Sequence, residues 1–210
     1  MGTFNLRRTC AAVAAALVLT APVLANAAST ITTGTATPLT ASAQLDFQVV
    51  VPKVLFLQVG AGSLMGANTT VNQIAFTVPG GTIGNGTAVV ASAASGDLGN
   101  GVVTARVVGN NGNVTLSSTT TGALTDAAGD TLSYTQIGTA ATAGATGNLL
   151  LPPALADAAT TTETLTAVKN VVNMDAKWTF SFLNTAVVPP GTYGGVNANN
   201  SRVTYTASMP

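Results

Sequence analysis

An alternating stretch near the C-terminus constrains the fold of this chain more than any other feature. From Lys177 to Phe182, small or charged residues alternate with Trp178, Phe180 and Phe182. A period of two places the three rings on one face of an extended strand. A surface platform for stacking sugars is the alternative, but alternation with polar neighbours favours rings that face a core. We therefore expect a half-buried β-strand here.

A second alternating stretch follows at 202–207, after a break at Pro189-Pro190-Gly191. Val203 and Tyr205 fall on one side of it, and proline and glycine punctuate the chain before it. The two stretches predict a closing pair of strands.

The most apolar segment outside the N-terminal region is 44–60. Its first half alternates, with one side formed by Leu45, Phe47, Val49 and Val51, which predicts a strand with one buried face. After Pro52 the apolar run continues without strict alternation, which predicts a strand covered on both faces. We expect a core that includes Phe47, Phe56 and Phe76.

Turn signals separate further short strands. Gly84-Asn85-Gly86 and Gly99-Asn100-Gly101 each predict a tight turn, and Asn110-Asn111-Gly112-Asn113 predicts a hairpin between strands at 102–108 and 114–116. The two Gly-Asn-Gly units could form an internal repeat, but recurrent turn chemistry explains them more simply. Weaker patterns predict strands at 132–137 and 165–172, a loop at 138–147 and a helical turn at 154–159. Eight to ten short strands predict an all-β antiparallel sandwich, immunoglobulin-like or jelly-roll-like, with long Gly/Ala/Thr loops.

The N-terminal region has the features of a secretory signal peptide over residues 1–27. Arg7-Arg8 precede an apolar run from Ala11 to Leu24, and Ala25-Asn26-Ala27 provides a small-x-small cleavage site. A membrane anchor is the alternative, but the run is shorter than the ~20 apolar residues that a spanning helix needs. We expect general secretion to the cell surface or the extracellular space, with no membrane span after cleavage. The mature chain then consists of an extension at 28–43 and a single domain at 44–210.

Low charge indicates a chain that packs against its own copies. Only 7% of the residues are charged, against ~25% in an ordinary soluble domain. Without Arg7 and Arg8 the chain keeps five basic and seven acidic residues, 5 − 7 = −2. No basic patch is available to bind nucleic acid. A surface hydrated mainly by neutral polar side chains gives only weak electrostatic repulsion between copies of the chain.

The residue types exclude most catalytic chemistry. The chain has no histidine, and its one cysteine, Cys10, lies in the predicted signal peptide. Serine–histidine and cysteine–histidine nucleophiles and the usual zinc and copper sites are therefore excluded. Asp126-Ala127-Ala128-Gly129-Asp130 lacks the ligand spacing of a calcium loop and predicts a polar turn. We expect a protein that is not an enzyme, with no catalytic, cofactor-binding or metal-binding residues.

The C-terminal motif resembles a known class of secreted bacterial proteins. Pro189-Pro190-Gly191-Thr192-Tyr193, followed by the strand at 202–207, is similar to the ending of β-sandwich surface subunits such as spore-coat-U-like and other fimbrial pilins. The resemblance implies that Gly191 and Tyr193 shape the turn into the last strand, and that Val203 and Tyr205 face the core. The cysteines common in those pilins are missing here, and 194–200 forms an additional loop.

These observations favour a structural subunit of a cell-surface filament, pilus or coat that assembles by β-strand addition between copies. The expected donor is Ser29 to Ala43, which is rich in threonine and punctuated by Pro38; a disordered terminus is the alternative. The main expected partner is a second copy, with a secretion chaperone or a surface glycan as further candidates. The alternative function is a monomeric adhesin or carbohydrate-binding module, which would be favoured by an exposed aromatic cluster.

Overall fold

The computed structural model describes residues 29–210, so the predicted signal peptide lies outside the described residues. The chain divides into two units, one ending at Val50 and one spanning Val51–Pro210. Residues 29–50 contain neither helix nor strand. The compact unit thus begins at Val51, whereas the sequence places the start of the domain at residue 44. No helix within residues 29–210 is long and apolar enough to cross a membrane.

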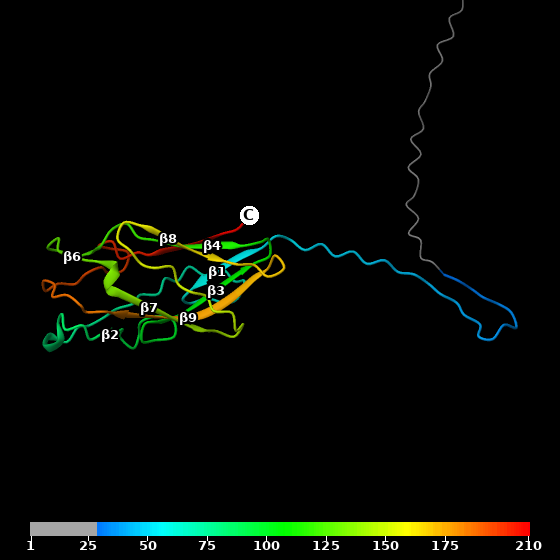
Figure 1. Cartoon of the computed structure of the whole chain (residues 1–210), viewed down its shortest axis with the longest axis horizontal. Helices are drawn as coiled ribbons and strands as arrows, with labels where there is room; N and C mark the ends of the chain where they lie inside the picture. Colours follow the sequence, from blue (N-terminus) through cyan, green and yellow to red (C-terminus); the bar gives the residue numbers. More distant parts are fainter. Residues whose placement is uncertain (1–28) are drawn as a thin grey trace, which may run out of the picture. The chain divides into compact units, whose positions relative to one another are not determined.

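The domain is built from antiparallel strands, as the sequence predicts (Figure 1). One sheet contains β1, β2, β3, β7 and β9, a second contains β4, β8 and β10, and β5 and β6 form a small hairpin. The strand bounds are β1 (Leu55–Val59), β2 (Val89–Val90), β3 (Val102–Gly109), β4 (Val114–Thr119), β5 (Leu124–Thr125), β6 (Thr131–Leu132), β7 (Ile137–Ala143), β8 (Thr160–Leu165), β9 (Val172–Phe182) and β10 (Thr204–Ser208). Two short 3-10 turns complete the elements, at Gly80–Thr82 and Tyr134–Gln136.

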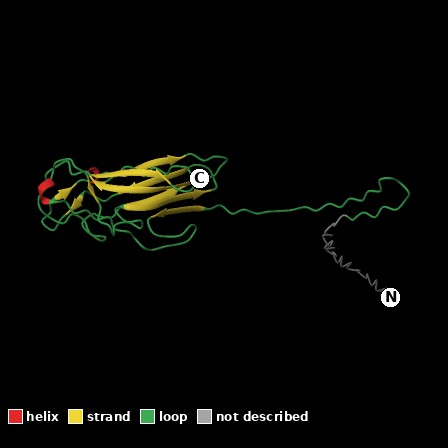
Figure 2. Cartoon of the chain, turned by 90° about the horizontal axis from the view of Figure 1, so that it is seen from below, coloured by secondary structure: helices red, strands yellow, loops and turns green. Residues whose placement is uncertain are grey.

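The long strand β9 organises the first sheet. On one side it pairs with β3, from Val102 opposite Thr179 to Gly109 opposite Val172, and on the other side it pairs with β7. Strand β1 pairs with β3 and lies at the edge of this sheet. In the second sheet β4 is central, with β8 and β10 at the two edges. Figure 2 shows the strands of the domain running in broadly the same direction, with loops gathered at the ends.

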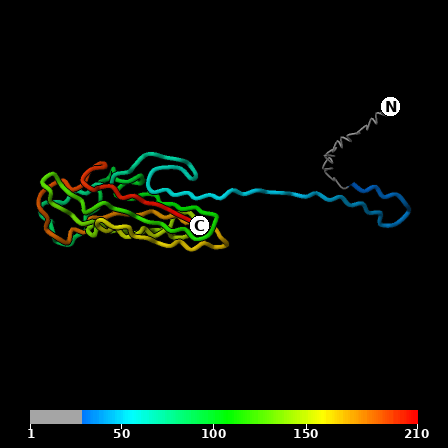
Figure 3. Tube along the Cα trace, turned by 90° about the horizontal axis from the view of Figure 1, so that it is seen from above, coloured from blue at the N-terminus to red at the C-terminus, as the bar shows by residue number. Residues whose placement is uncertain are grey.

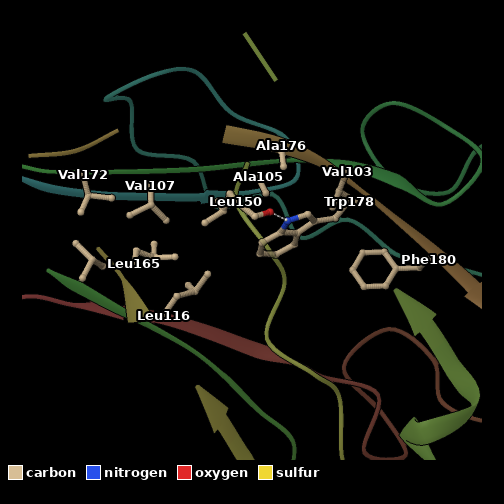
Figure 4. Close-up of a cluster of buried hydrophobic side chains, with 11 residues drawn as sticks. Val103, Ala105, Val107, Leu116, Leu150, Leu165, Val172, Ala176, Trp178 and Phe180 are labelled. Carbon is tan, nitrogen blue, oxygen red and sulfur yellow. Dashed lines mark hydrogen bonds between the residues drawn. The ribbon is translucent and has the colours of Figure 1, made fainter. Parts of the chain in front are cut away.

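The core lies between the two sheets and contains the rings of Trp178 and Phe180 of β9 (Figure 4). Trp178 is fully buried, and Phe180 and Phe182 are also buried, which confirms the core prediction for this strand. Val107 of β3 and Leu116 of β4 meet these residues from the two sheets. The indole Nε1 of Trp178 donates a hydrogen bond to the carbonyl of Leu150 at 2.7 Å, so the one polar atom of this ring is satisfied.

The two strand pairs expected from turn signals are wrong, although the strands exist. The turn at 110–113 joins β3 to β4, which belong to different sheets. Strands β9 and β10 are likewise in different sheets, and β10 pairs with β4. A turn residue fixes where the chain reverses, and in a sandwich that reversal can cross from one sheet to the other.

Four weaker predictions are also corrected. The expected loop at 138–147 is mostly β7, whose small residues pair with β9. The expected strand at 132–137 contains the turn Tyr134–Gln136, in which Tyr134 is buried and donates its hydroxyl to the carbonyl of Asn200. The segment 154–159 forms no helix, and β8 ends at Leu165 instead of starting there. Edge pairing and tertiary contacts override local propensity at these positions.

Two of the expected core phenylalanines lie elsewhere. Phe47 is 85% exposed and belongs to the extension before the compact unit. Phe56 is half-buried and sits opposite Val108, on the face of the sheet that points away from the core. Its neighbours Leu57 and Val59 contact the core instead. Residues 44–51 alternate as predicted from the sequence, but the four apolar side chains on one side of the segment are exposed in the structure.

Candidate assembly groove

Two strand edges lie side by side with no strand between them. In the described residues β1 pairs only with β3, and β10 pairs only with β4. These edge strands belong to opposite sheets and are in contact with each other. Figure 3 follows the C-terminal segment, in red, along the domain to the C-terminus. Each edge therefore presents unpaired backbone N–H and C=O groups.

A groove of about 1000 Å³ opens along these edges. One wall comes from β1 and from the segment 70–78, and the other from residues 188–197 and the chain leading into β10. Apart from β1 and β10, the residues of both walls form neither helix nor strand. A groove of this size is larger than the voids that a well-packed domain leaves between its own side chains.

The floor of the groove is the hydrophobic core itself. The buried residues Val103, Phe180 and Phe182 line it. Around them lie side chains that contact the core but are only half-buried: Leu57, Val59, Ile74, Phe76 and Tyr205. The rings of Phe76 and Phe182 lie 6.4 Å apart, which carries the aromatic cluster of β9 into the floor. The groove thus exposes the edge of the core where a further strand would cover it.

The residues of the C-terminal motif lie in one wall of this groove. Gly191, Tyr193, Val203 and Tyr205 all line it. Tyr193 donates its hydroxyl to the carbonyl of Pro189 at 2.8 Å, which closes the loop before β10. Val203 and Tyr205 are half-buried, and Tyr205 faces the core as the resemblance implies.

Gly191 is required by a close contact. A Cβ atom at this position would lie 2.3 Å from Oδ2 of Asp126. Asp126 is buried, and its Oδ1 accepts hydrogen bonds from the N–H groups of Ala128 and Asp130, both at 2.9 Å. The loop at 189–193 therefore packs directly onto the β5–β6 turn, and only glycine fits there without displacement.

Burial affects the two tyrosines nearest the core. Burial raises the pKa of Tyr205 well above its ordinary value, and the nearby Tyr134 hydroxyl acts in the same direction. Burial, followed by the charge of Asp157, raises the pKa of Tyr134 to about 12. Both hydroxyls are therefore neutral at physiological pH and provide no base or nucleophile.

The acidic side chains of the domain are spread over separate loops and strands. Asp97 accepts from the N–H of Thr104, and Asp157 accepts from the N–H of Tyr134. Burial raises the pKa of Asp175, but hydrogen bonds from Thr146 and Ala145 and the charge of Arg106 outweigh it, so the net shift is downward. Within residues 29–210 no three His, Cys, Asp or Glu side chains are grouped to hold a metal ion. The carboxylates that accept these bonds fasten turns and loops.

Comparison with family models, with curated proteins and with solved structures returned no match. The sheets and the groove therefore define a class by geometry alone, an all-β sandwich that leaves two neighbouring strand edges open over its core.

The sequence indicates the wall of the groove next to β10 but not the wall next to β1. The motif from Pro189 to Tyr205 indicated the β10 side. Ile74 and Phe76 alternate, which predicts a strand, but that prediction is wrong: residues 71–79 form no strand, and both side chains are half-buried in the lining of the groove. One feature of the sequence does point to an open apolar surface. The four large apolar side chains on one side of 44–51 are more than a strand at the protein surface usually carries.

Proposed function

We propose that this chain is a secreted, non-enzymatic structural subunit of a cell-surface filament, pilus or coat, whose copies assemble by adding a β-strand to one another. The observation that carries the proposal is the apolar groove between the free edges of β1 and β10. An extended segment placed in it would pair its backbone with the edges and its alternate side chains with the floor.

The energetics favour occupation of the groove. Half-buried side chains such as Ile74 and Phe76 would lose their remaining contact with water. Burying apolar surface contributes ~25 cal/mol per Å², and a strand with three or four inward side chains would contribute several kcal/mol. The unpaired backbone groups on both edges would gain hydrogen bonds at the same time. An unpaired strand edge is a template for pairing with another chain.

The composition agrees with self-assembly. A mature chain with five basic and seven acidic residues repels its copies weakly. Secretion remains part of the proposal through the predicted signal peptide. A chaperone that covers the groove during export is a further candidate partner, because an open apolar edge is prone to wrong pairing.

A glycan-binding module receives less support. That alternative expects an exposed aromatic cluster, and among the residues from 29 to 210 Phe47 alone is an exposed aromatic. The rings of β9 are buried and cannot stack on a sugar.

The test is electron microscopy of the exported chain, together with size-exclusion chromatography at several concentrations. Filaments or sheets that grow with concentration are expected. Val203→Glu places a charge in the groove wall and should abolish them, whereas the matched Val168→Glu, exposed in the β8–β9 turn and outside the groove, should assemble normally. A chain that stays monomeric at every concentration would contradict the proposal.

A further inference from the structure

We propose that the strand filling the groove is Gln44–Val51 of a second copy, and not the Ser29–Ala43 segment that the sequence favours. The assignment rests on the proposed assembly by strand addition and specifies its donor. The apolar stripe of this segment is formed by Leu45, Phe47, Val49 and Val51. All four side chains are exposed in the structure.

The pattern of the segment matches the requirements of the groove. A strand lying in the groove along the edge of β1 or β10 must direct every second side chain onto an apolar floor and the others toward solvent. The apolar stripe supplies the first set, and the second set consists of Gln44, Asp46, Gln48 and Val50, of which only Val50 is apolar. The largest member, Phe47, fits a floor that already contains Phe76, Phe180 and Phe182.

The segment 29–43 matches the groove poorly. Its large apolar residues are only Ile31 and Leu39, separated by small and polar residues. A strand made mainly of threonine, serine and alanine would leave most of the floor uncovered. Loop or linker composition of this kind is typical of a spacer.

A long exposed apolar stripe needs a cover. Single exposed apolar side chains are common, but contiguous ones mark interaction sites or aggregation hazards. The stripe is also extended and free of secondary structure, so it can pair with an edge without unfolding anything first. The groove lacks a strand to cover its apolar floor, and the stripe lacks an apolar surface to cover its side chains.

Contacts at the start of β1 fix the point at which the donor segment joins its own domain. Asn110 donates to the carbonyl of Pro52 at 2.7 Å and accepts from the N–H of Val54 at 2.7 Å. The N–H of Asn110 also donates to the carbonyl of Val54, which extends the β1–β3 ladder to the beginning of the strand. Pro52 and Val54 are thus tied to Asn110, and the proposed donor ends immediately before them; the disulfide experiment below distinguishes the groove of a second copy from that of the same chain.

This donor predicts the geometry of the assembly. The interface joins the groove of one copy to the stripe of the next, so it is heterologous and adds copies head to tail. Only Pro52 to Val54 separate the donor strand from β1 of its own domain. Successive domains would then be joined by a three-residue connection, and the filament should be stiff, because a short connection restricts the orientations of its neighbours.

A pair of adjacent valines provides the first test. Val49 belongs to the stripe and Val50 to the opposite side, and they are 83% and 82% exposed. Val49→Asp and Val50→Asp should fold equally well, with the same melting temperature. Val49→Asp should lower the association constant at least about tenfold, whereas Val50→Asp should assemble like the unmodified chain. Equal assembly of the two variants would overturn the assignment.

Deletion separates the two segments. Removing residues 29–43 should leave assembly intact, since the stripe remains. Loss of assembly in this variant, with normal assembly of Val49→Asp, would show that 29–43 is the donor.

A disulfide trap distinguishes this assignment from the proposed function. The chain has no cysteine after Cys10, so a copy carrying Val49→Cys can be mixed with a copy carrying Ile74→Cys or Val203→Cys on the two groove walls. A covalent dimer is expected, and Val50→Cys should give far less. A chain that forms filaments without this dimer would overturn the donor alone, and a chain that neither assembles nor cross-links would overturn both. A disulfide within a monomer carrying both substitutions would assign the stripe to its own groove.

Discussion

Tyr205 lies against Trp178 with the two ring centroids 5.4 Å apart and the ring planes inclined by 47°. Trp178 is fully buried at the centre of the sandwich, whereas Tyr205 is half-buried in the wall of the groove. The side chain of Tyr205 thus lies between the ring of Trp178 and the open groove.

Replacement of this ring should destabilise the domain. Tyr205→Ala should lower the free energy of unfolding by about 2 kcal/mol, because a fully buried aromatic costs ~3–5 kcal/mol and Tyr205 is only half-buried. Tyr205→Phe keeps the ring and should change stability by less than about 0.5 kcal/mol. Urea unfolding followed by the fluorescence of Trp178, the chain's one tryptophan, measures both. An alanine variant as stable as the phenylalanine variant would refute this view of the pair.

The contact between Gly191 and Asp126 gives a second prediction. Gly191→Ala should cost about 1–3 kcal/mol, because the new Cβ overlaps a buried carboxylate that holds the β5–β6 turn. Gly81→Ala is the matched control, since a Cβ there meets nothing within 4 Å. Thermal unfolding of both variants, and of Gly191→Ala combined with Asp126→Ala, tests the contact. The double variant should lose less than the sum of the two single losses if the overlap is the cause.

The sequence predicted the all-β fold because alternation reports which residues share a face. Trp178, Phe180 and Phe182 are buried as their period indicates. The turn signals at Asn100 and Asn110 also fall between strands. These features depend on a few neighbouring residues, so a single sequence contains them.

Pairing and burial partners depend on distant residues, and there the sequence was insufficient. Phe47 alternates as well as Phe180 does, yet it is exposed, because alternation does not specify which surface covers the apolar face. Strand β7 is composed of small residues with weak β-propensity, and it forms because β9 offers it an edge. The groove itself is the absence of a strand, which no local pattern encodes.

The buried tyrosines predict weakening of the fold in alkali. The ordinary pKa of tyrosine is ~10, and burial raises the pKa of Tyr134 to about 12 in the folded state. The folded protein holds this proton more tightly, so the stability is fully present below pH ~10 and is lost as the pH rises through 12. The pKa of Tyr205 is raised in the same direction.

Unfolding free energies measured between pH 8 and 12 check this prediction. The unmodified chain should lose stability steeply above pH ~10. The combined variant Tyr134→Phe and Tyr205→Phe should start lower at pH 8, because the hydrogen bond from Tyr134 to Asn200 is removed, but should show a shallower decline. Parallel curves for the two proteins would contradict it.

Asp175 predicts the opposite dependence at acid pH. Its pKa is lowered in the folded state, since the N–H groups of Ala145 and Thr146, the Thr146 hydroxyl and the Arg106 charge together outweigh the effect of burial. The carboxylate therefore contributes stability that is fully present above the unfolded pKa of ~3.9 and is lost as the pH falls through the lower, folded value.

Two variants divide this contribution between the charge and one of its hydrogen bonds. Asp175→Asn should be less stable at pH 7, because the loop at 144–147 loses its anionic acceptor, and its stability should vary less between pH 5 and pH 2. Thr146→Val keeps the carboxylate but removes the hydroxyl that lowers its pKa, so its acid transition should move to higher pH than that of the unmodified chain. Acid titration followed by circular dichroism, with the fluorescence of Trp178 as a second probe, measures both midpoints. An unchanged midpoint in Thr146→Val would show that the backbone N–H groups and Arg106 suffice to hold Asp175 ionised, and would remove the hydroxyl from this account.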